Sequence, residues 1–415
     1  MMMRMLLTGF SLFAMLALTC VLHVCADQRR EAQVLPSERV QMEESNGAVL
    51  HFITRSNAND ANAYFHQRSW LPDESMLFFW SDRTGRREVF GYLEKTGEIV
   101  QLQQEGDSHI QQFTAGMHEN ALYFARDKNV WEWSIDIDFS HSPTRIFVEE
   151  RCIAEFPQDA GDAMLGINES CGGKGIVVGF NSRGPHANRV IWIDKTSGES
   201  REIMAVDYPI SHIQCSWKTP GLISFARGYE GSQGDRATNL SEGELRARIH
   251  WADLTDREPW PIYPQIEGEL VTHECWWVND QMTFCSGQYH DGAAEQSHVK
   301  VYDPRLDRTY IIGPGSWWEG GTPEQVSRVN YWHAAGSPDG RFAAADNWHG
   351  IITLFSAKTS RHRILTQDHR TYGRGAHPHV GWSPSSSKLV FASNRYGNPD
   401  VCILFLPESW LENSW

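Results

Sequence analysis

Short runs of β-forming residues, repeated between turns along most of the 415 residues, limit what this chain can fold into. Residues 73–79, 339–344 and 385–391 share one pattern, a turn followed by a hydrophobic strand with an aromatic residue. Such strands without helical periodicity are typical of a sandwich, a barrel or a propeller. Units of the pattern begin near residues 62, 107, 158, 208, 270, 329 and 375. This period is close to that of four-stranded propeller blades, about 40–50 residues, and favours a propeller.

The two ends of the repeated region complement each other. The last unit predicts only three strands, at residues 379–382, 388–393 and 401–406, whereas residues 47–55 form a spare strand before the first unit. Pairing the spare strand into the last blade would close the ring and cover both free edges. The sequence therefore predicts an all-β fold, a single seven-bladed β-propeller over residues 47–415 that is closed by an N-terminal strand.

The first 26 residues predict a signal peptide. Arg4 precedes an almost wholly apolar run, which ends in the small residues Val24-Cys25-Ala26. A membrane anchor, or a lipoprotein modified at Cys20, is the alternative. We expect an exported protein, periplasmic or extracellular, because no later stretch is long and apolar enough to span a bilayer after cleavage. The polar residues 27–46 are expected to form a flexible leader.

Charge and cysteine content exclude several classes of protein. The chain has 37 Lys and Arg against 52 Asp and Glu, a net charge of −15, which argues against nucleic acid as a partner. Six of its 8 cysteines follow the signal segment, and none forms a CxxC pair of the kind found in zinc knuckles. They predict either buried free thiols or one or two disulfides, with Cys152 and Cys171 the nearest pair. Oligomeric state is not predicted.

Histidines recur at one position of the repeat. The first strand of a propeller blade lines the central channel, so residues at the same place in different blades converge there. Crowded imidazoles lose protons or bind a cation, and neutral histidine is a common ligand of transition metals. Six of the seven units are predicted to carry a histidine on the first strand: His66, His109, His212, His273, His333 and His379.

Four of the histidines have the arrangement of a metal site. His377 and His379 are two residues apart, so in a strand both rings face the same side. His273 would add a third ligand from another blade, and His333 lies between. This set fits Mn²⁺, Zn²⁺ or Ni²⁺. Nearby aromatic residues either pack between blades or contact sugar; with His66, the predicted substrate-binding residues are Trp276, Tyr331 and Trp332.

Several of these motifs resemble those of the oligogalacturonate lyases. The likeness lies in GELVTHE at residues 268–274, AHPH at 376–379, NAYFHQRSW at 62–70 and SDRTG at 81–85. That family consists of seven-bladed propellers that cleave uronate oligosaccharides by β-elimination with a metal, commonly manganese. The resemblance implies that His273, His377 and His379 are ligands. Arg374 replaces the family's glutamine ligand, so either His333 completes the set or Arg374 supplies the positive charge itself.

The resemblance implies a lyase acting on a uronate-containing oligosaccharide or polysaccharide, with a divalent metal, most often Mn²⁺. A cation on the substrate carboxylate would stabilise the intermediate while a base takes the C5 proton. We expect His212 to be the base, Arg227 or Arg374 to bind the carboxylate, and His109 to be a reserve acid or base. The alternatives are a metal-independent lyase like the related ulvan lyases, which use His, Tyr and Arg groups, and a non-catalytic binding propeller.

Other enzyme classes have less support in the sequence. A serine peptidase is disfavoured because no GxSxG nucleophile motif occurs. A glycoside hydrolase with two carboxylates stays open, since residues far apart in the sequence can meet in the fold.

Overall fold

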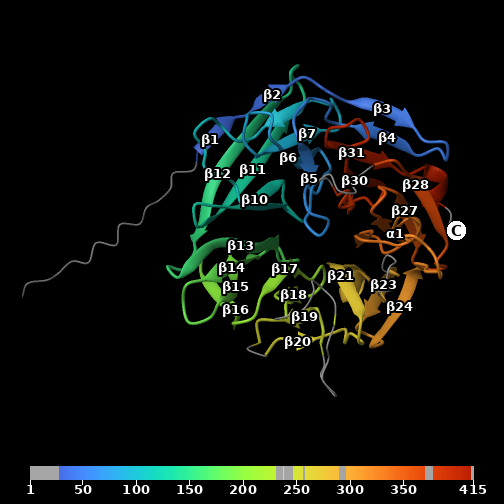
Figure 1. Cartoon of the computed structure of the whole chain (residues 1–415). Coiled ribbons are helices and arrows are strands. Elements are labelled where there is room, and N and C mark those ends of the chain that lie inside the picture. Colours follow the sequence, from blue (N-terminus) through green and yellow to red (C-terminus); the bar gives the residue numbers. More distant parts are fainter. Residues whose placement is uncertain are drawn as a thin grey trace, which may run out of the picture.

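The computed structural model describes residues 28–229, 237, 246–255, 258–288, 296–369 and 377–412. Seven antiparallel sheets are arranged in a ring around a common axis, as Figure 1 shows. Each sheet is one blade, and the chain runs from its innermost strand outwards over the next two strands. The predicted all-β, seven-bladed propeller is confirmed.

The first three blades follow the chain in order from the innermost strand outwards. The first blade consists of β5 (Asp60–Asn62), β6 (Met76–Ser81), β7 (Glu88–Leu93) and β8 (Ile99–Gln101). The second consists of β9 (Gln112–Ala115), β10 (Ala121–Arg126), β11 (Asn129–Asp138) and β12 (Arg145–Glu155). The third consists of β13 (Ala160–Glu169), β14 (Gly175–Ser182), β15 (Asn188–Asp194) and β16 (Ser200–Val206).

Blades four to six have the same layout, with the helix α1 (Pro323–Ser327) between the fifth and sixth and a short turn η1 (Val278–Asp280) within the fifth. The fourth blade consists of β17 (Ile210–Cys215), β18 (Ile223–Arg227), β19 (Ile249–Ala252) and β20 (Trp260–Pro261). The fifth consists of β21 (Glu269–Trp276), β22 (Met282–Gln288), β23 (His298–Asp303) and β24 (Arg308–Gly313). The sixth consists of β25 (Ala334–Gly336), β26 (Phe342–Asp346), β27 (Ile352–Ser356) and β28 (His362–Thr366).

The seventh blade joins the two ends of the propeller. It takes β29 (Gly381–Trp382), β30 (Lys388–Ser393) and β31 (Asp400–Phe405) from the end of the chain, before the helix α2 (Glu408–Glu412). Its fourth strand is β4 (Val49–Phe52), which pairs with β31 so that Phe52 lies opposite Cys402. Closure by an N-terminal strand within residues 47–55 is therefore confirmed.

The segment expected to be a flexible leader is instead built into the sheets, and that expectation is wrong for residues 28–43. It forms β1 (Gln28–Glu31), β2 (Gln33–Leu35) and β3 (Val40–Glu43), which are the outermost strands on β12, β8 and β4. An outer strand is held by backbone hydrogen bonds, so its side chains can be polar and exposed while it protects the edge of a blade. The predicted signal peptide lies outside the described residues.

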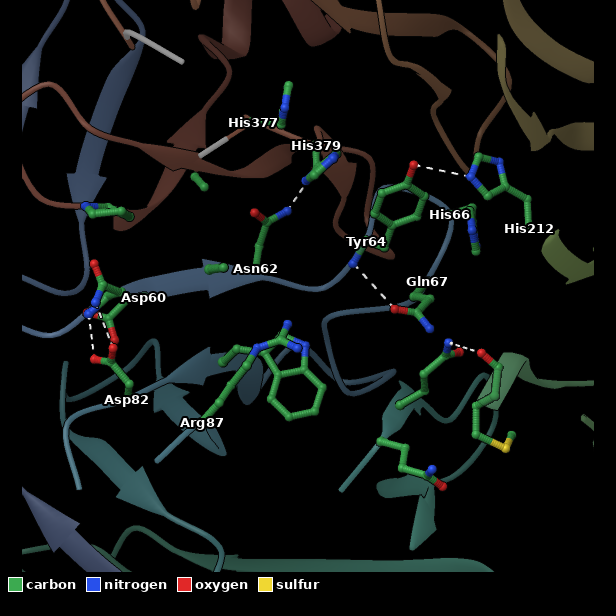
Figure 2. Close-up of a pocket in the computed structure, with 18 of the residues that line it drawn as sticks. Asp60, Asn62, Tyr64, His66, Gln67, Asp82, Arg87, His212, His377 and His379 are labelled. Atoms are coloured by element: carbon green, nitrogen blue, oxygen red, sulfur yellow. Dashed lines mark hydrogen bonds between the residues drawn. The ribbon is translucent and has the colours of Figure 1, made fainter. Parts of the chain in front are cut away.

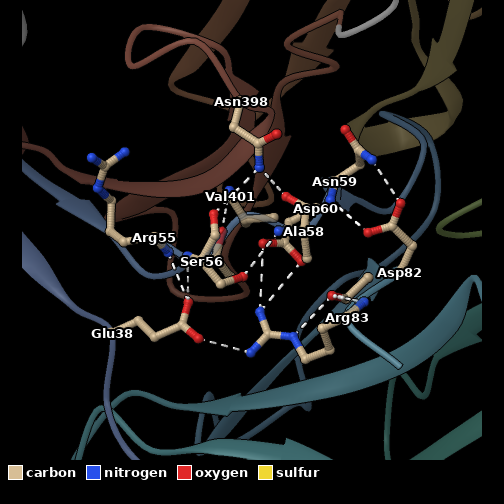
Figure 3. A network of polar contacts seen from close by, with 12 residues as sticks. Glu38, Arg55, Ser56, Ala58, Asn59, Asp60, Asp82, Arg83, Asn398 and Val401 are labelled. Carbon is tan, nitrogen blue, oxygen red and sulfur yellow. Dashed lines mark hydrogen bonds and ion pairs between the residues drawn. The ribbon is translucent and has the colours of Figure 1, made fainter. Parts of the chain in front are cut away.

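Ion pairs fix this N-terminal segment where the ring closes (Figure 3). Glu38 pairs with Arg83 at 3.0 Å and accepts the backbone N–H of Arg55 at 2.8 Å. Arg83 also reaches the buried Asp60 at 3.4 Å, and Arg55 pairs with Asp400 on β31 at 2.7 Å. The first and last blades are thus joined by side chains as well as by strand pairing.

The stability of this closure should depend on pH through Asp400. Burial raises the pKa of Asp400 to about 6, and the nearby Arg55 only partly offsets this. The folded chain therefore keeps a proton that the unfolded chain loses between about pH 4 and pH 6, and the free energy of unfolding should fall across that window by at most about 3 kcal/mol. Urea unfolding of the wild type and of Asp400→Asn at several pH values measures this, since the variant lacks the titration.

The exposed Asp136 provides the control, because its side chain is 69% exposed. Asp136→Asn should leave the pH profile of the wild type unchanged. A difference between wild type and Asp400→Asn that stays constant from pH 4 to pH 7 would contradict the assignment.

The cysteines of the described residues are all free thiols. Cys215, Cys275, Cys285 and Cys402 are buried, and the two nearest in sequence are partly buried without a bond between them. The free-thiol alternative therefore holds, and the possible disulfide between Cys152 and Cys171 is not formed.

Within the ranges given above, no helix has both the length and the apolar character needed to cross a membrane.

Candidate active site

The connection from β5 to β6 crosses the central channel and divides it. The ring of Phe65 lies 5.7 Å from that of His273 and 5.5 Å from that of His333, on blades five and six. A cavity of about 650 Å³, here called the front cavity, opens on the side where the innermost strands begin. A second one of about 610 Å³, the rear cavity, opens where they end. His66 and Gln67 line both, so the crossing segment is the wall between them.

The structure brings six histidines together at the base of the front cavity. The ring centres of His273 and His333 are 4.1 Å apart, and those of His333 and His379 are 4.5 Å apart. His377 lies 5.5 Å from His379, while His66 lies 5.5 Å from His212 on the other side. Five of the six sequence-predicted channel histidines are thus in one cluster, together with His377. Figure 2 shows the members that line the front cavity: His66, His212, His377 and His379.

An unusual backbone conformation directs three of these rings inward. His212, His273 and His379 have φ angles of 52°, 54° and 49°, in the left-handed region. The pairing of β17 shifts between Ser211 and Gln214, and that of β21 between Thr272 and Cys275, so two of the histidines sit at β-bulges. A bulge changes the direction of a side chain, and such strain concentrates at functional sites.

Asp346, the last residue of β26, orients two histidines of the cluster. Its carboxylate contacts the Nδ1 atom of His333 at 2.8 Å and accepts the backbone N–H of His379 at 3.0 Å. The Nδ1 atom of His273 is held in a similar way by the hydroxyl of Thr272 at 2.7 Å. Since Nδ1 is occupied in both rings, Nε2 is the atom left to bind a ligand.

His212 is held between a tyrosine and a carboxylate. Its Nδ1 atom lies 3.0 Å from Glu274 Oε1, and its Nε2 atom lies 3.3 Å from the hydroxyl of Tyr64 (Figure 2 shows the latter contact). The other carboxylate oxygen of Glu274 accepts Arg248 Nε at 2.8 Å, while Arg248 Nη2 lies 3.2 Å from His212 Nδ1. We assign the ring proton to Nδ1, because Glu274, which can only accept, lies nearer to Nδ1 at 3.0 Å than Arg248, which can only donate, at 3.2 Å. Nε2 is then the basic atom.

Burial and neighbouring charges lower the pKa values of the carboxylate of Glu274 and of four histidines in the cluster. Burial alone would raise the pKa of Glu274, but Arg248 and His212 together lower it well below its usual value. Burial, helped by the charge of His212, lowers the pKa of His66 to about 3. Burial and neighbouring histidines also lower the pKa values of His273, His377 and His379. Neutral rings have a lone pair available for a cation or a proton.

The donor chemistry of the four predicted ligands fits a divalent transition metal. All four are imidazoles, and the pKa values of His273, His377 and His379 are lowered. Asp346 or Thr272 orients two of the four rings, as is usual around metal-bound histidines. As they stand, however, no three His, Cys, Asp or Glu side chains within the described part of the chain form a group that could hold one ion. The residue types therefore fit a metal ion, but their side chains do not converge on one point as a ligand set would.

Two of the predicted catalytic residues lie elsewhere. His109 is exposed in the loop before β9, which begins only at Gln112, so it is not on a first strand as expected. Arg227 ends β18, where its guanidinium lies over the rings of Tyr208 at 4.0 Å and Tyr229 at 4.9 Å. Neither is brought into the histidine cluster. Arg374 lies outside the described residues.

Two of the predicted substrate-binding aromatic residues are core residues instead. Trp276 is fully buried, stacks on Trp251 with ring centres 5.0 Å apart and donates to a backbone carbonyl. Tyr331 packs in the apolar cluster between blades five and six, where burial raises its pKa to about 12. Trp332 is different, because it is only half-buried and lies 5.2 Å from the ring of His273.

The sequence interpretation missed four residues that hold the cluster together: Tyr64, Arg248, Glu274 and Asp346. Two of them could have been found from the sequence, because they lie beside predicted histidines: Tyr64 is two residues before His66, and Glu274 directly follows His273. Asp346 ends the second strand of its blade and Arg248 directly precedes the third strand of its own, and nothing in their local sequence marks them.

Comparisons with known proteins agree with the fold. No protein-family model matches the chain, and no curated protein matches it. Among solved structures, an oligogalacturonate lyase in complex with manganese is similar with a TM-score of 0.68 at 17% identity, over 91% of this chain and 98% of the other. An oligogalacturonate lyase from Vibrio parahaemolyticus is similar with a TM-score of 0.69 at 17% identity, over 92% of this chain and 100% of the other. At this identity the likeness shows the propeller fold.

Proposed function

We propose that this protein is a lyase that cleaves a uronate-containing oligosaccharide or polysaccharide by β-elimination in the front cavity. The observation that carries the proposal is the chain of contacts from Tyr64 through His212 to Glu274, set beside a cluster of histidines of which four have lowered pKa values. The structural likeness to oligogalacturonate lyases supports the same class of reaction. Export, expected from the first 26 residues, would bring the protein to glycans outside the cell.

The reaction needs a base, a proton donor and positive charge near the substrate. His212 Nε2 takes the proton from C5 of the uronate, and Glu274 stabilises the imidazolium that forms. The C4–O bond then breaks, a C4–C5 double bond forms, and the leaving oxygen takes up a proton. Tyr64 is placed to donate that proton, since its hydroxyl already contacts the base. The product is an unsaturated uronate and a shortened glycan.

Positive charge on the substrate carboxylate lowers the barrier to losing the C5 proton. Arg87 lines the front cavity, stacked 4.1 Å over the ring of Trp80, and we propose that it binds a substrate carboxylate. A divalent cation, most readily Mn²⁺, would supply further charge when held by His273, His333, His377 and His379. Trp332, beside His273, offers an aromatic face for a sugar ring.

The direct test of the proposal is product formation. The purified protein is mixed with oligogalacturonate, polygalacturonate and ulvan, each with Mn²⁺ or with a chelator, and the ultraviolet absorbance of the unsaturated uronate is followed. We expect new absorbance with at least one of these substrates. If none gives it under either condition, the protein is not a uronate lyase and the binding-propeller alternative replaces the proposal.

Metal dependence gives a separate prediction. Replacing both His377 and His379 by alanine should remove bound Mn²⁺, measured by elemental analysis of the purified protein, because two of the four donors are lost. His118→Ala with His141→Ala is the matched control, since both of those histidines are exposed, and it should keep the metal. Unchanged metal content in the His377 and His379 variant would rule out this ligand set.

A metal-independent lyase is the second candidate, and the contact between Tyr64 and His212 favours it, because the two side chains form an acid–base pair on their own. The chelator arm of the activity test separates the two mechanisms. Activity that survives chelation supports the acid–base pair alone, whereas activity that is lost and then restored by Mn²⁺ supports the metal site.

A further inference from the structure

The rear cavity has the properties of a second binding site, separate from the front cavity. Its volume of about 610 Å³ falls in the range of pockets that hold small molecules. Three indole rings line it, those of Trp70, Trp217 and Trp382. Flat aromatic faces of this kind pack well against the carbon face of a ring-shaped ligand.

The charge of the rear cavity is positive, although the chain carries a net charge of −15. The charged residues that line it are Arg68 and Lys218, and no Asp or Glu of the described residues lines it. Arg68 is part of the segment that crosses the channel, whereas Lys218 is exposed at the mouth. The cavity thus favours an anion over a neutral or cationic molecule.

Two polar groups in the cavity wall lack partners among the described residues. The Nη1 atom of Arg68 and the Nε1 atom of Trp70 are buried without a hydrogen bond. Glu169, the carboxylate whose charge acts most on Arg68, is already engaged, because it accepts Lys195 Nζ at 2.7 Å and the backbone N–H of Met117 at 2.5 Å. A buried donor without an acceptor costs free energy. The side chain of Arg68 as a whole is only partly buried and lines the cavity, so its charge can attract a ligand carboxylate there.

We infer that the rear cavity binds a small carboxylate-bearing molecule with a flat carbon face, held by Arg68 and Lys218 and stacked on Trp217 or Trp382. A hexuronate monosaccharide has this chemistry and size. Only the choice of a sugar acid rests on the proposed function; the carboxylate specificity follows from the cavity itself. The crossing segment lies between this ligand and the histidine cluster, so the two sites share a wall formed by His66 and Gln67.

The test is calorimetric titration of the full chain with sodium D-galacturonate, and with D-galactose as the neutral probe. We expect galacturonate to bind and galactose not to bind measurably. Arg68→Gln should weaken the affinity by about 10–100-fold, the size expected for a lost charged hydrogen bond. Lys218→Glu should also weaken it, and since this side chain is exposed the variant should fold normally even if Arg68→Gln does not.

Lys358→Glu is the matched control, because it makes the same charge reversal at an exposed residue outside the cavity and should bind like the wild type. No heat of binding with galacturonate, or an affinity that survives both Arg68→Gln and Lys218→Glu, would overturn the inference. The lyase assay reports on the front cavity alone. Galacturonate binding that depends on Arg68 in a protein without lyase activity would therefore support the rear site while refuting the proposed reaction.

Discussion

Replacing His212 by alanine is expected to lower turnover on a uronate-containing glycan by about 10²–10⁴-fold, the usual contribution of a general base. His212 is the histidine of the cluster whose Nε2 atom faces Tyr64 and whose Nδ1 atom faces a carboxylate. Without the imidazole, neither Glu274 nor Tyr64 can accept the C5 proton as readily at neutral pH. Initial rates from the absorbance of the unsaturated product measure the effect.

The controls for this variant separate catalysis from folding and from metal binding. Glu274 keeps its ion pair with Arg248 at 2.8 Å, so the buried charge stays compensated and the variant should fold. Its Mn²⁺ content should equal that of the wild type. His109→Ala, in an exposed loop, should be fully active. If His212→Ala had the turnover of the wild type, another residue of the cluster would have to be the base.

The fold could be predicted because its signals are local and repeated. Each blade contributes the same short strands and turns, so the spacing of the units identified the propeller without knowledge of long-range contacts. The three-stranded last unit and the spare strand at residues 47–55 were enough to predict the closure seen between β4 and β31. Residues 28–43 were misjudged, since an outer strand held by backbone hydrogen bonds needs no apolar pattern.

The candidate site could be predicted only in part, because a strand pattern gives the face of a residue but not its exact height in the channel. His109 lies three positions before the start of β9, a shift that removes it from the cluster. His212 and His273 reach the channel through bulges with left-handed backbone, which no alternation pattern anticipates. Trp276 and Tyr331 illustrate the opposite error, since aromatic residues near a site more often pack between blades.

The residues that hold the histidines could not be predicted from the sequence, for a different reason. Asp346 lies 13 positions after His333, and Glu274 lies 62 positions after His212, although each pair is in contact. Such contacts depend on how the blades sit around the ring. The geometry of the site therefore depends on the ring staying closed, since strained residues keep their conformation only while the surrounding structure holds them.

Closure of the ring should in turn depend strongly on one strand. Phe52 on β4 is fully buried in the last blade, where β4 pairs with β31. Its ring centre lies 4.9 Å from that of Tyr396. Phe52→Ala removes that packing and leaves a cavity, so we expect a loss of about 3–5 kcal/mol in the free energy of unfolding. This is a large fraction of the about 5–15 kcal/mol typical of folded proteins. Urea unfolding followed by circular dichroism measures the loss.

Val40 provides a matched control within the same sheet. It lies directly opposite Phe52 in the pairing of β3 with β4, yet its side chain is 43% exposed. Val40→Ala should therefore cost less than about 1 kcal/mol, since little buried surface is lost. Equal losses in the two variants would mean that strand pairing rather than burial holds the closure. A negligible loss in Phe52→Ala would mean that closure does not need the packing of Phe52, because the pairing of β4 with β31 and the ion pairs of Glu38, Arg55 and Arg83 suffice.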